Sequence, residues 1–270
     1  MGTKPKSPII TLTTDFGADD YFAGVMKGVI LKINPEAKLV DITHNISPFQ
    51  IKEAAFLLNN FFSYFPPKTI HLIVVDPGVG TKRHAIIVKT RDYLFVAPDN
   101  GVLSYIYKNE KDFKVYEITR DKYFLKPVSQ TFHGRDIFAP VVAHLSRGVS
   151  PDKFGKIIKE FEHFPVSEAV FEKNHIKGEI LYCDCFGNLI TNITKKNFEK
   201  ALALPNCKIF KIGTKSFRID NLSNSYSAGK ADTLSAIWGS HGHLEIFLKN
   251  GNAHSELGIK PGLKIMISFW

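Results

Sequence analysis

The chain has 270 residues, of which 44% are hydrophobic and 23% charged, which is ordinary for a globular protein and excludes a disordered or fibrous chain. Its net charge of +9 comes from basic residues scattered without a dense run or a nucleic-acid-binding motif, so nucleic-acid binding is not expected. Three cysteines are too few for a disulfide framework, and neither an apolar signal core nor a run of about 18 apolar residues is present, which predicts a cytoplasmic protein without a membrane segment.

Strand signals recur over the first 165 residues. Short apolar, β-branched runs predict strands at residues 9–13, 39–42 and 70–75, and a hairpin-like pair at 84–89 and 93–96. The run at 70–75 is almost continuously apolar, as expected of a parallel strand covered on both faces.

Helical patterns lie between these strands. Apolar residues recur at helical spacing over 21–33, and the acidic pair at 19–20 is suited to cap that helix. Further helices are predicted over 47–62, with Ser47 as the N-cap, and over 136–147. The alternation predicts an α/β domain over residues 1–165, with a mostly parallel central sheet flanked by helices.

The pattern changes in the last third of the chain. Residues 148–174 are charged and irregular and are interpreted as a connection between domains. Beyond them, turn signals separate short predicted strands at 176–182, 189–193, 207–212, 234–237, 244–248 and 264–269. These strands predict a smaller all-β domain over residues 172–270, built as an antiparallel barrel or sandwich.

Two loops carry the side chains that are best suited to chemistry. Asp76 follows the apolar strand in I-V-V-D-P-G-V-G-T-K-R, Arg83 ends the same segment, and His133 lies in T-F-H-G-R-D. A carboxylate, a guanidinium and an imidazole can together bind and deprotonate a water molecule without a metal. Each residue also has a plainer interpretation: a turn-forming Asp, a solvated Arg and a core His.

Two further segments suit the recognition of a nucleoside. Asp15, between a strand and a helix, can accept hydrogen bonds from the vicinal hydroxyls of a ribose, or it can simply cap a turn. Phe186 offers a stacking face, and Asn188 offers a donor and an acceptor for an adenine edge, although both also fit an ordinary hairpin turn.

The remaining polar clusters are expected to have structural roles. Arg135 and Asp136 are expected to brace their loop and to cap the following helix, and residues 99–101 are interpreted as a turn and nothing more. Cys183 and Cys185 lack a second pair at zinc-like spacing, so no metal site is expected.

Five collinear motifs carry a resemblance to a known family. They are T-T-D-F-G at 13–17, V-V-D-P-G-V-G-T-x-R at 74–83, A-P-D-N-G-V-L-S at 97–104, T-F-H-G-R-D-I-F-A-P at 131–140 and D-x-F-G-N-L-I-T-N at 184–192. Together they resemble the S-adenosyl-L-methionine (SAM) hydroxide adenosyltransferases, also called SAM hydrolases, which are relatives of the SAM-dependent fluorinase and chlorinase.

The resemblance implies a fold, an assembly and a set of residue roles. It implies an α/β N-terminal domain, a β-barrel-like C-terminal domain and a homotrimer whose active sites lie between the N-domain of one subunit and the C-domain of its neighbour. The implied water-activating residues are Asp76, Arg83 and His133. The implied substrate contacts are Asp15 at the ribose diol, Phe49 beside the substrate, Phe186 and Asn188 at adenine, Asp184 and Asp19 at the methionine end, Ser240 at the methionine carboxylate and the Ala253 backbone at adenine.

Two positions depart from the halogenating relatives. The halogenases have a Tyr where this chain has Asp76, and an Arg where it has His241, which puts carboxylate binding at that point in doubt. A carboxylate at contact distance from a halide repels it, so water is the expected nucleophile.

The resemblance therefore implies hydrolysis of SAM to adenosine and L-methionine, with SAM as substrate and with no metal or retained cofactor. Three alternatives stay open: a halide-dependent adenosyl transferase, a SAM- or adenosine-binding protein without activity, and a nucleic-acid-binding module suggested only by the charge of +9.

Overall fold

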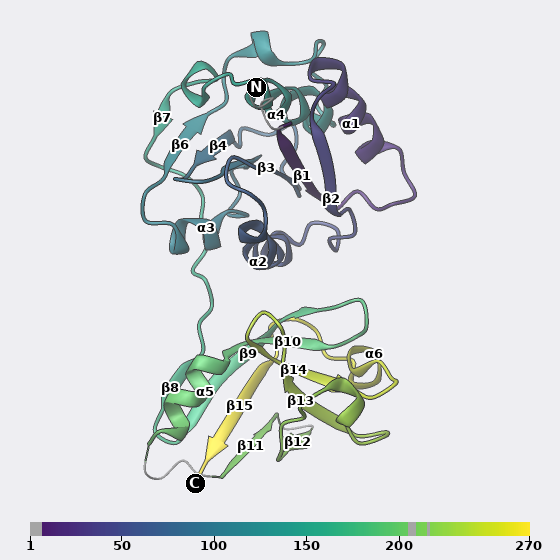
Figure 1. The fold of residues 1–270 in the computed structure, drawn as a ribbon, viewed down its shortest axis with the longest axis vertical. Helices are drawn as coiled ribbons and strands as arrows, with labels where there is room; N and C mark the ends of the chain where they lie inside the picture. Colours follow the sequence, from purple (N-terminus) through teal and green to yellow (C-terminus); the bar gives the residue numbers. More distant parts are fainter. Residues whose placement is uncertain (1–6, 205–208, 215–216) are drawn as a thin grey trace, which may run out of the picture. The chain divides into compact units, whose positions relative to one another are not determined.

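The computed structural model describes residues 7–204, 209–214 and 217–270, and its contacts divide the chain into two compact units, Met1–Val166 and Ser167–Trp270. Figure 1 shows both units, and each is described by itself below. The predicted strand at 207–212 lies partly outside the described residues and is observed from Phe210 onward.

A seven-stranded mixed sheet forms the centre of the first unit. Its order is β2-β1-β3-β5-β4-β6-β7. The bounds are β1 Ile9–Thr14, β2 Lys38–Thr43, β3 Ile70–Val74, β4 Ala85–Lys89, β5 Leu94–Pro98, β6 Lys114–Glu117 and β7 Ile157–Ile158. Strands β2, β1, β3 and β5 are parallel neighbours, whereas β4, β6 and β7 continue the sheet in antiparallel pairs. The predicted α/β sheet and its hairpin-like pair are confirmed.

Helices cover both faces of this sheet (Figure 1). Helices α1 (Phe22–Ile33) and α4 (Ala139–Ser146) pack on one face, and α2 (Ile51–Phe61) and α3 (Ser104–Asn109) on the other. Strand β3 serves both cores, because its alternate side chains point to opposite faces: Leu72 and Val74 join the first core and Ile73 the second. Two buried faces explain why the run at 70–75 is apolar throughout.

One predicted helix cap and two predicted helix starts are wrong. Tyr21 occupies the N-cap position of α1 in place of the predicted acidic pair. Helix α2 begins at Ile51 and not near Ser47, because Phe49 has φ +67°, a left-handed conformation that a right-handed helix cannot include. A π-helical turn, η3 (Gly134–Phe138), precedes α4, so Asp136 does not cap that helix.

The second unit is an antiparallel, barrel-like sheet, as predicted. Its order is β12-β11-β15-β9-β10-β14-β13, with β8 paired to β9. The bounds are β8 Val170–Glu172, β9 His175–Cys183, β10 Leu189–Thr194, β11 Phe210–Gly213, β12 Arg218–Ile219, β13 Leu234–Trp238, β14 His243–Leu248 and β15 Lys264–Phe269. Just beyond β12, Leu222 forms an isolated bridge to Ala236 of β13, so the two edges of the sheet approach each other.

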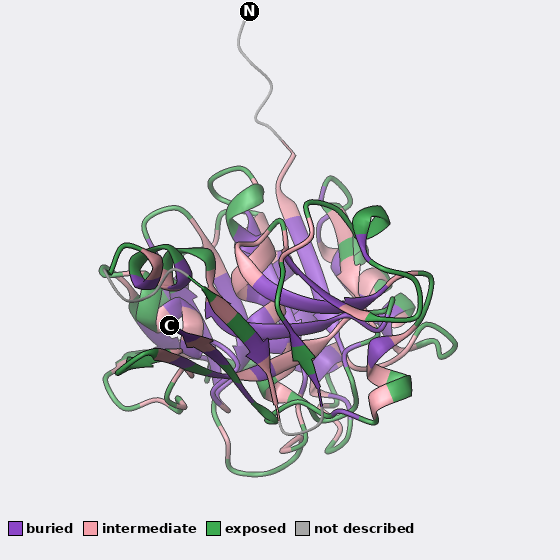
Figure 2. Cartoon of the chain, turned by 90° about the horizontal axis from the view of Figure 1, so that it is seen from below, coloured by how far each residue is buried: buried purple, intermediate pink, exposed green. Residues whose placement is uncertain are grey.

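Two short helices of this unit were missed from sequence: α5 (Lys195–Leu202) and α6 (Ala253–Leu257). A capping box stabilises the start of α5, in which Thr194 and Asn197 exchange side-chain and backbone hydrogen bonds. Figure 2 shows buried residues along the strands and exposed residues mainly in loops and on the outer faces of helices. None of the described helices combines the length and hydropathy that crossing a lipid bilayer requires.

Candidate active site

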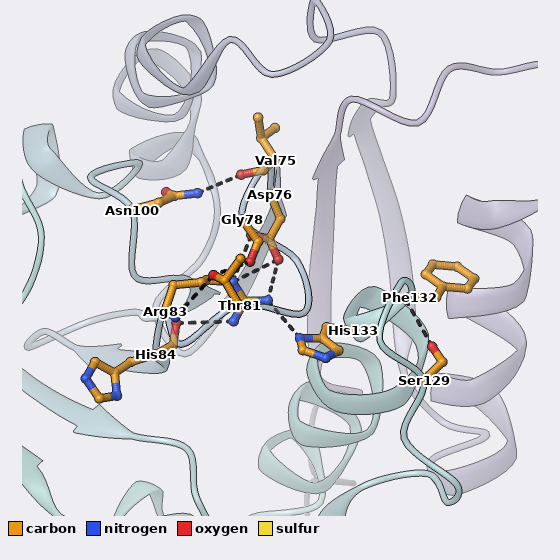
Figure 3. Close-up of polar contacts among 10 residues, drawn as sticks. All are labelled: Val75, Asp76, Gly78, Thr81, Arg83, His84, Asn100, Ser129, Phe132 and His133. Carbon is orange, nitrogen blue, oxygen red and sulfur yellow. Dashed lines mark hydrogen bonds and ion pairs between the residues drawn. The ribbon is translucent and has the colours of Figure 1, made fainter.

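An ion pair joins the two ends of the loop between β3 and β4. Asp76 follows the last buried residues of β3, and Arg83 stands two residues before β4. The Arg83 Nε atom donates to Asp76 Oδ1 at 2.8 Å and to Oδ2 at 3.0 Å, and Nη2 also donates to Oδ2 (Figure 3). Their side chains are only 6% and 10% exposed, so the pair is shielded from solvent and its geometry is restricted.

A glycine brings this loop against the segment that carries His133. Gly80 has φ +77°, and a Cβ atom built on it would lie 2.3 Å from the carbonyl oxygen of Gln130. No side chain fits into that contact, because the obstacle is backbone that cannot rotate away. The second glycine of G-V-G therefore permits the close approach of two loops that are separated by some fifty positions in the sequence.

His133 completes a chain of three side chains. Arg83 Nη2 lies 3.0 Å from His133 Nδ1 (Figure 3). A guanidinium can only donate hydrogen bonds, so Nδ1 is the acceptor, and the hydrogen-bond network assigns the neutral tautomer with its proton on Nε2. Burial, and then the positive charge of Arg83, lower the pKa of His133, which favours the same neutral form.

A buried carboxylate holds the His133 segment in place. Asp136 is fully buried and accepts hydrogen bonds from the Ser129 backbone N–H at 2.8 Å and from the Ser129 hydroxyl at 2.7 Å, while Arg135 Nε lies 2.6 Å away. The Ser129 hydroxyl oxygen in turn accepts from the Phe132 N–H at 3.0 Å (Figure 3). The predicted bracing by Arg135 and Asp136 is confirmed.

A cavity of about 300 Å³ opens beside this chain of side chains. Asp76 and His133 line it, whereas Arg83 is not among its lining residues and lies behind them. An aromatic wall closes part of it, with the Phe132 ring edge-on to Phe16 and Phe22 at centroid distances of 5.8 and 5.2 Å. The cavity therefore combines an apolar wall with two polar groups whose orientation is already set.

Asp15 and Phe49 form another wall of the same cavity. The Phe49 N–H donates to Asp15 Oδ2 at 3.0 Å, and this bond helps to hold Phe49 in its left-handed conformation. The Phe49 ring is 67% exposed at the cavity rim. Burial raises the pKa of Asp15, backbone hydrogen bonds from Phe49 and Asp15 itself offset part of that rise, and the charge of Asp76 adds to it.

Asp19 is placed differently from the other candidates of the first unit. It is exposed in the turn that precedes α1. Among the described residues that line the cavity, Asp19 is absent. The first unit thus brings together Asp15, Phe49, Asp76 and His133 around one cavity, with Arg83 behind it.

In the second unit, Asp184 organises the hairpin between β9 and β10. Its Oδ1 accepts the backbone N–H groups of Phe186 at 2.9 Å and Asn188 at 2.8 Å, and its Oδ2 accepts the Asn188 amide at 2.8 Å. These bonds fix the turn and leave the Phe186 ring 73% exposed. An ordinary hairpin turn and a role in adenine recognition are therefore compatible, because the turn itself exposes the Phe186 ring.

Ala253 lies close to this hairpin, and Ser240 lies further along the sheet. The N–H of His254 donates to the Gly187 carbonyl at 3.0 Å, which holds the start of α6 against the turn. Ser240 is in the turn between β13 and β14, at the His243 end of the β10–β14 ladder, whereas the hairpin at 184–188 adjoins its Leu189 end. Beside Ser240, His241 Nε2 lies 3.1 Å from Glu245 Oε1.

Several lining residues were not singled out from sequence. Phe16, Phe22, Val79 and Thr131 contribute to the cavity. Phe16, Val79 and Thr131 belong to the motifs at 13–17, 74–83 and 131–140, so membership of these motifs could have identified them. Phe22 lies outside the motifs, and only its packing shows that it lines the cavity. Among the described residues, no three His, Cys, Asp or Glu side chains gather in an arrangement that could hold a metal ion.

Comparisons with known proteins show which family this chain matches. Residues 10–155 match the family described as SAM hydroxide adenosyltransferase N-terminal domain, and residues 178–266 match its C-terminal domain. A relative from Methanocaldococcus jannaschii, named (R)-S-adenosyl-L-methionine hydrolase, is 39% identical over 194 residues, or 69% of this chain and 67% of that protein. One of the same name from Thermus thermophilus is 31% identical and covers 94% of this chain and 97% of its own length.

Other matches are a solved structure and a more distant group of enzymes. A structure from Thermotoga maritima, described as an uncharacterized conserved protein, superposes with a TM-score of 0.88 at 37% identity and covers 96% of this chain and 99% of its own. A fluorinase from Nocardia brasiliensis is 24% identical and covers 98% of both chains.

Proposed function

The chain belongs to the SAM hydroxide adenosyltransferase family, and we propose that it hydrolyses S-adenosyl-L-methionine to adenosine and L-methionine. The observation that carries the proposal is the hydrogen-bonded chain Asp76–Arg83–His133 at the wall of a cavity. Relatives with 30% identity or more that are named (R)-S-adenosyl-L-methionine hydrolase support it further.

The reaction is an in-line displacement at the ribose C5′ carbon. The oxygen of a water molecule forms a bond to C5′ while the C5′–sulfur bond breaks, and its electron pair moves to sulfur, which leaves as the neutral thioether of methionine. The water loses one proton, so the products are adenosine, L-methionine and H⁺. Because the sulfonium is already a good leaving group, the protein chiefly has to position and deprotonate the water.

The three side chains divide that task. Asp76 lines the cavity and is the proton acceptor, since the Nδ1 lone pair of His133 is already used by Arg83. The Nε2–H of His133 orients the water, and the charge of Arg83 favours a developing hydroxide from behind. The neutral form of His133 is required for this arrangement, which its lowered pKa supports.

Substrate binding draws on both units of the chain. Asp15 accepts the ribose hydroxyls, with Phe49 packing beside the sugar, while Phe186, Asn188 and the Ala253 backbone contact adenine. Asp19, Asp184 and Ser240 face the methionine end. A cavity of about 300 Å³ is at the lower limit for small-molecule pockets, so the first unit alone encloses only part of SAM. This supports an assembly in which another surface completes the site, and we propose the homotrimer with active sites shared between neighbouring subunits.

The rival halide-dependent reaction is disfavoured by Asp76. A halide in the cavity would meet a carboxylate that is only 6% exposed, where little water screens the repulsion. Water, which can donate to that carboxylate, is attracted by the same charge. We also propose a cytoplasmic location and no resident cofactor or metal, on the basis of the cysteine content and of a mechanism that uses side chains alone.

Product analysis in isotopically heavy water tests the reaction. Purified protein, SAM and H₂¹⁸O are expected to yield L-methionine and adenosine labelled at the 5′ oxygen. Adenosine without the label would rule out attack on C5′, and formation of 5′-chloro-5′-deoxyadenosine only when chloride is added would favour the halide reaction. Separate assays of the R and S sulfonium epimers identify which one the site accepts, as the name of the relatives raises that question.

Subunit mixing tests the shared site. At a SAM concentration well below the KM of the hairpin variant, Asp76→Ala alone and Phe186→Ala/Asn188→Ala alone are each expected to be nearly inactive. When the two proteins are unfolded, mixed and refolded together, activity is expected to return, because some sites then pair an intact first unit with an intact second unit from a neighbour. Sites formed within a single chain would give no recovery, and that result would reject the shared site.

A further inference from the structure

The turn at residues 99–101 forms hydrogen bonds to the backbone next to Asp76 and next to Arg83. Residues 99–101 follow β5 and lie beside the ends of β3 and β4 (Figure 3). In the sheet order β3-β5-β4, β5 is the strand between the one that leads to Asp76 and the one that follows Arg83. A loop at its end is therefore placed to set the distance between the two.

The side chain of Asn100 holds the peptide bond next to Asp76. Its Nδ2 donates to the Val75 carbonyl at 2.9 Å (Figure 3). Its Oδ1 accepts the Val102 N–H at 3.2 Å. The register of β3 with β1 ends at Val74, so the ladder does not extend to this buried carbonyl. Because the carbonyl of Val75 and the N–H and Cα of Asp76 belong to one planar peptide unit, fixing the carbonyl fixes the position of this Cα and restricts where the Asp76 side chain can point.

Asp99 holds the backbone next to Arg83. Its N–H donates to the His84 carbonyl at 2.9 Å, one residue beyond the last β4–β5 pair. The Arg83 Nη1 atom donates to the same carbonyl at 3.3 Å. The backbone of the turn and the guanidinium of Arg83 thus share a single acceptor, which restricts Arg83 from the side opposite Asp76.

The turn is held in place by hydrogen bonds to the segment at 162–164. The buried Asp99 carboxylate accepts the Glu162 N–H at 2.9 Å. The Gly101 carbonyl accepts from the Ser104 hydroxyl at 2.6 Å, whose oxygen accepts the Phe164 N–H at 3.0 Å. Gly101 has φ +94°, which a residue with a side chain rarely adopts. An anchored turn can transmit a restraint, whereas a mobile one cannot.

We propose that Asn100 is a positioning residue for the hydrolysis, which acts through the Val75 carbonyl to hold Asp76 in line with the water and in register with Arg83. The inference rests on the proposed function, because it gives the restraint a catalytic purpose. Asn100 touches no reacting atom in this role. Its loss is expected to lower turnover and to leave substrate affinity nearly unchanged, because the groups assigned to binding stay in place.

A matched pair of asparagines separates positioning from stability. Asn34, directly after α1, also uses both ends of its amide: its Nδ2 donates to the Ser146 hydroxyl at 2.7 Å, and its Oδ1 accepts the Glu36 N–H at 3.2 Å. It is buried in the first unit and is not among the residues that line the cavity. Asn34→Ala and Asn100→Ala therefore each remove one donated and one accepted hydrogen bond of a side-chain amide, and only Asn100 binds the residue next to Asp76.

The test measures kcat, KM and Tm for the wild type, Asn34→Ala, Asn100→Ala and the isosteric Asn100→Asp. Asn100→Asp keeps the acceptor for Val102 but places an oxygen against the Val75 carbonyl. Both Asn100 variants are expected to lose roughly 10- to 100-fold in kcat, the size of effect that a misplacement of about 1 Å produces, with KM within about twofold. Asn34→Ala is expected to lower Tm with kcat unchanged. Equal kcat in folded Asn100→Asp and the wild type would overturn the proposal.

A second measurement does not depend on hydrolysis. The ¹⁵N chemical shifts of the His133 ring report which nitrogen carries the proton, and the wild type and Asn34→Ala are expected to show a single tautomer protonated on Nε2. Asn100→Asp is expected to show a mixture, because Arg83 no longer holds Nδ1 in a fixed geometry. A wild-type protein that fails to hydrolyse SAM would refute the proposed function, whereas a single tautomer with full kcat in the variant would refute only the role of Asn100.

Discussion

The cavity of the first unit and the hairpin at 184–188 of the second unit each contain an aspartate that accepts several hydrogen bonds, but the donors come from different parts of the chain. Asp76 is bound by the side chain of another residue, which also binds His133, so three side chains from distant segments restrain one another. Asp184 is bound within its own turn, by Phe186 and Asn188, and the result is an exposed ring.

The difference indicates a division of labour. Long-range side-chain bonds in a shielded place fix reacting groups relative to one another, which lowers the cost of reaching the transition state. A locally stabilised turn with an exposed ring provides affinity, because the ring gains contact area only when a ligand covers it. Changes to Asp76, Arg83 or His133 are therefore expected to lower kcat, and changes in the hairpin to raise KM.

The largest expected effect comes from Asp76→Asn, which keeps the shape of the side chain and removes its charge. The proposed proton acceptor is lost, so kcat is expected to fall roughly 10²- to 10⁴-fold while SAM binding changes little. The control is Asp41→Asn, at a carboxylate of the same unit that pairs with Lys27 on the surface. Comparable turnover in Asp76→Asn and the wild type would remove Asp76 from the chemistry.

A substitution in the hairpin at 184–188 is expected to raise KM for SAM. Phe186→Ala removes a stacking surface worth about 1–3 kcal/mol per base, so KM for SAM is expected to rise roughly 5- to 100-fold with a much smaller change in kcat. Phe171→Ala, at another exposed ring of the second unit, controls for a general loss of apolar surface. If Phe186→Ala lowered kcat and left KM unaltered, the contrast between the two regions would fail.

Asp15→Asn is expected to separate binding from stability within the cavity. An amide oxygen still accepts the Phe49 N–H, but it binds the ribose hydroxyls without charge, and charge-assisted bonds are worth about 1.5–3 kcal/mol, so KM should rise roughly 10- to 100-fold. Because burial raises the pKa of Asp15, the folded state disfavours its charge at neutral pH, and Tm is expected to stay equal or to increase. Calorimetry beside kinetics checks both, and a lower Tm with unchanged KM would contradict them.

The pH profile is expected to show an acid limb between the ordinary values of the two titrating groups. The pKa of His133 is lowered from 6.5, so the folded protein keeps this ring neutral to a lower pH than the unfolded chain does, and its contribution to stability rises with pH through that window. The pKa of Asp15 is raised from 3.8, and its contribution falls as pH rises through its own window. Because the proposed mechanism requires a neutral His133, kcat/KM is expected to decline as the pH falls below 6.5. A limb centred above 6.5 would contradict the assignment.

The smallest expected effect is that of a chelator. The proposed mechanism uses side chains and water alone, so prolonged dialysis against EDTA is expected to leave kcat within about twofold of its initial value. The comparison is made with metal content measured before and after dialysis. A loss of activity that added Zn²⁺ or Mg²⁺ restores would contradict the mechanism.

Most strands were predictable because alternate side chains of a strand face opposite sides of the sheet, so burial produces a recognisable pattern of apolar residues in the sequence. The strand at 264–269 was predicted with the bounds that β15 has, and the apolar run at 70–75 identified β3. Helix starts were less predictable. The start of α2 depends on the left-handed Phe49, a conformation maintained with the help of a bond to Asp15, and local propensity contains no information about that bond.

The sequence by itself determined the alternation of elements, the two kinds of core and the positions of reactive side chains beside strand ends, because periodicity and turn-forming residues act over a few positions. Only the tertiary structure decided that Arg83 bridges Asp76 and His133, that Gly80 admits a second loop, and that Asn100 binds the Val75 carbonyl. Those contacts join residues that are up to fifty positions apart, and packing of the sheet and its helices, rather than any local preference, sets such distances.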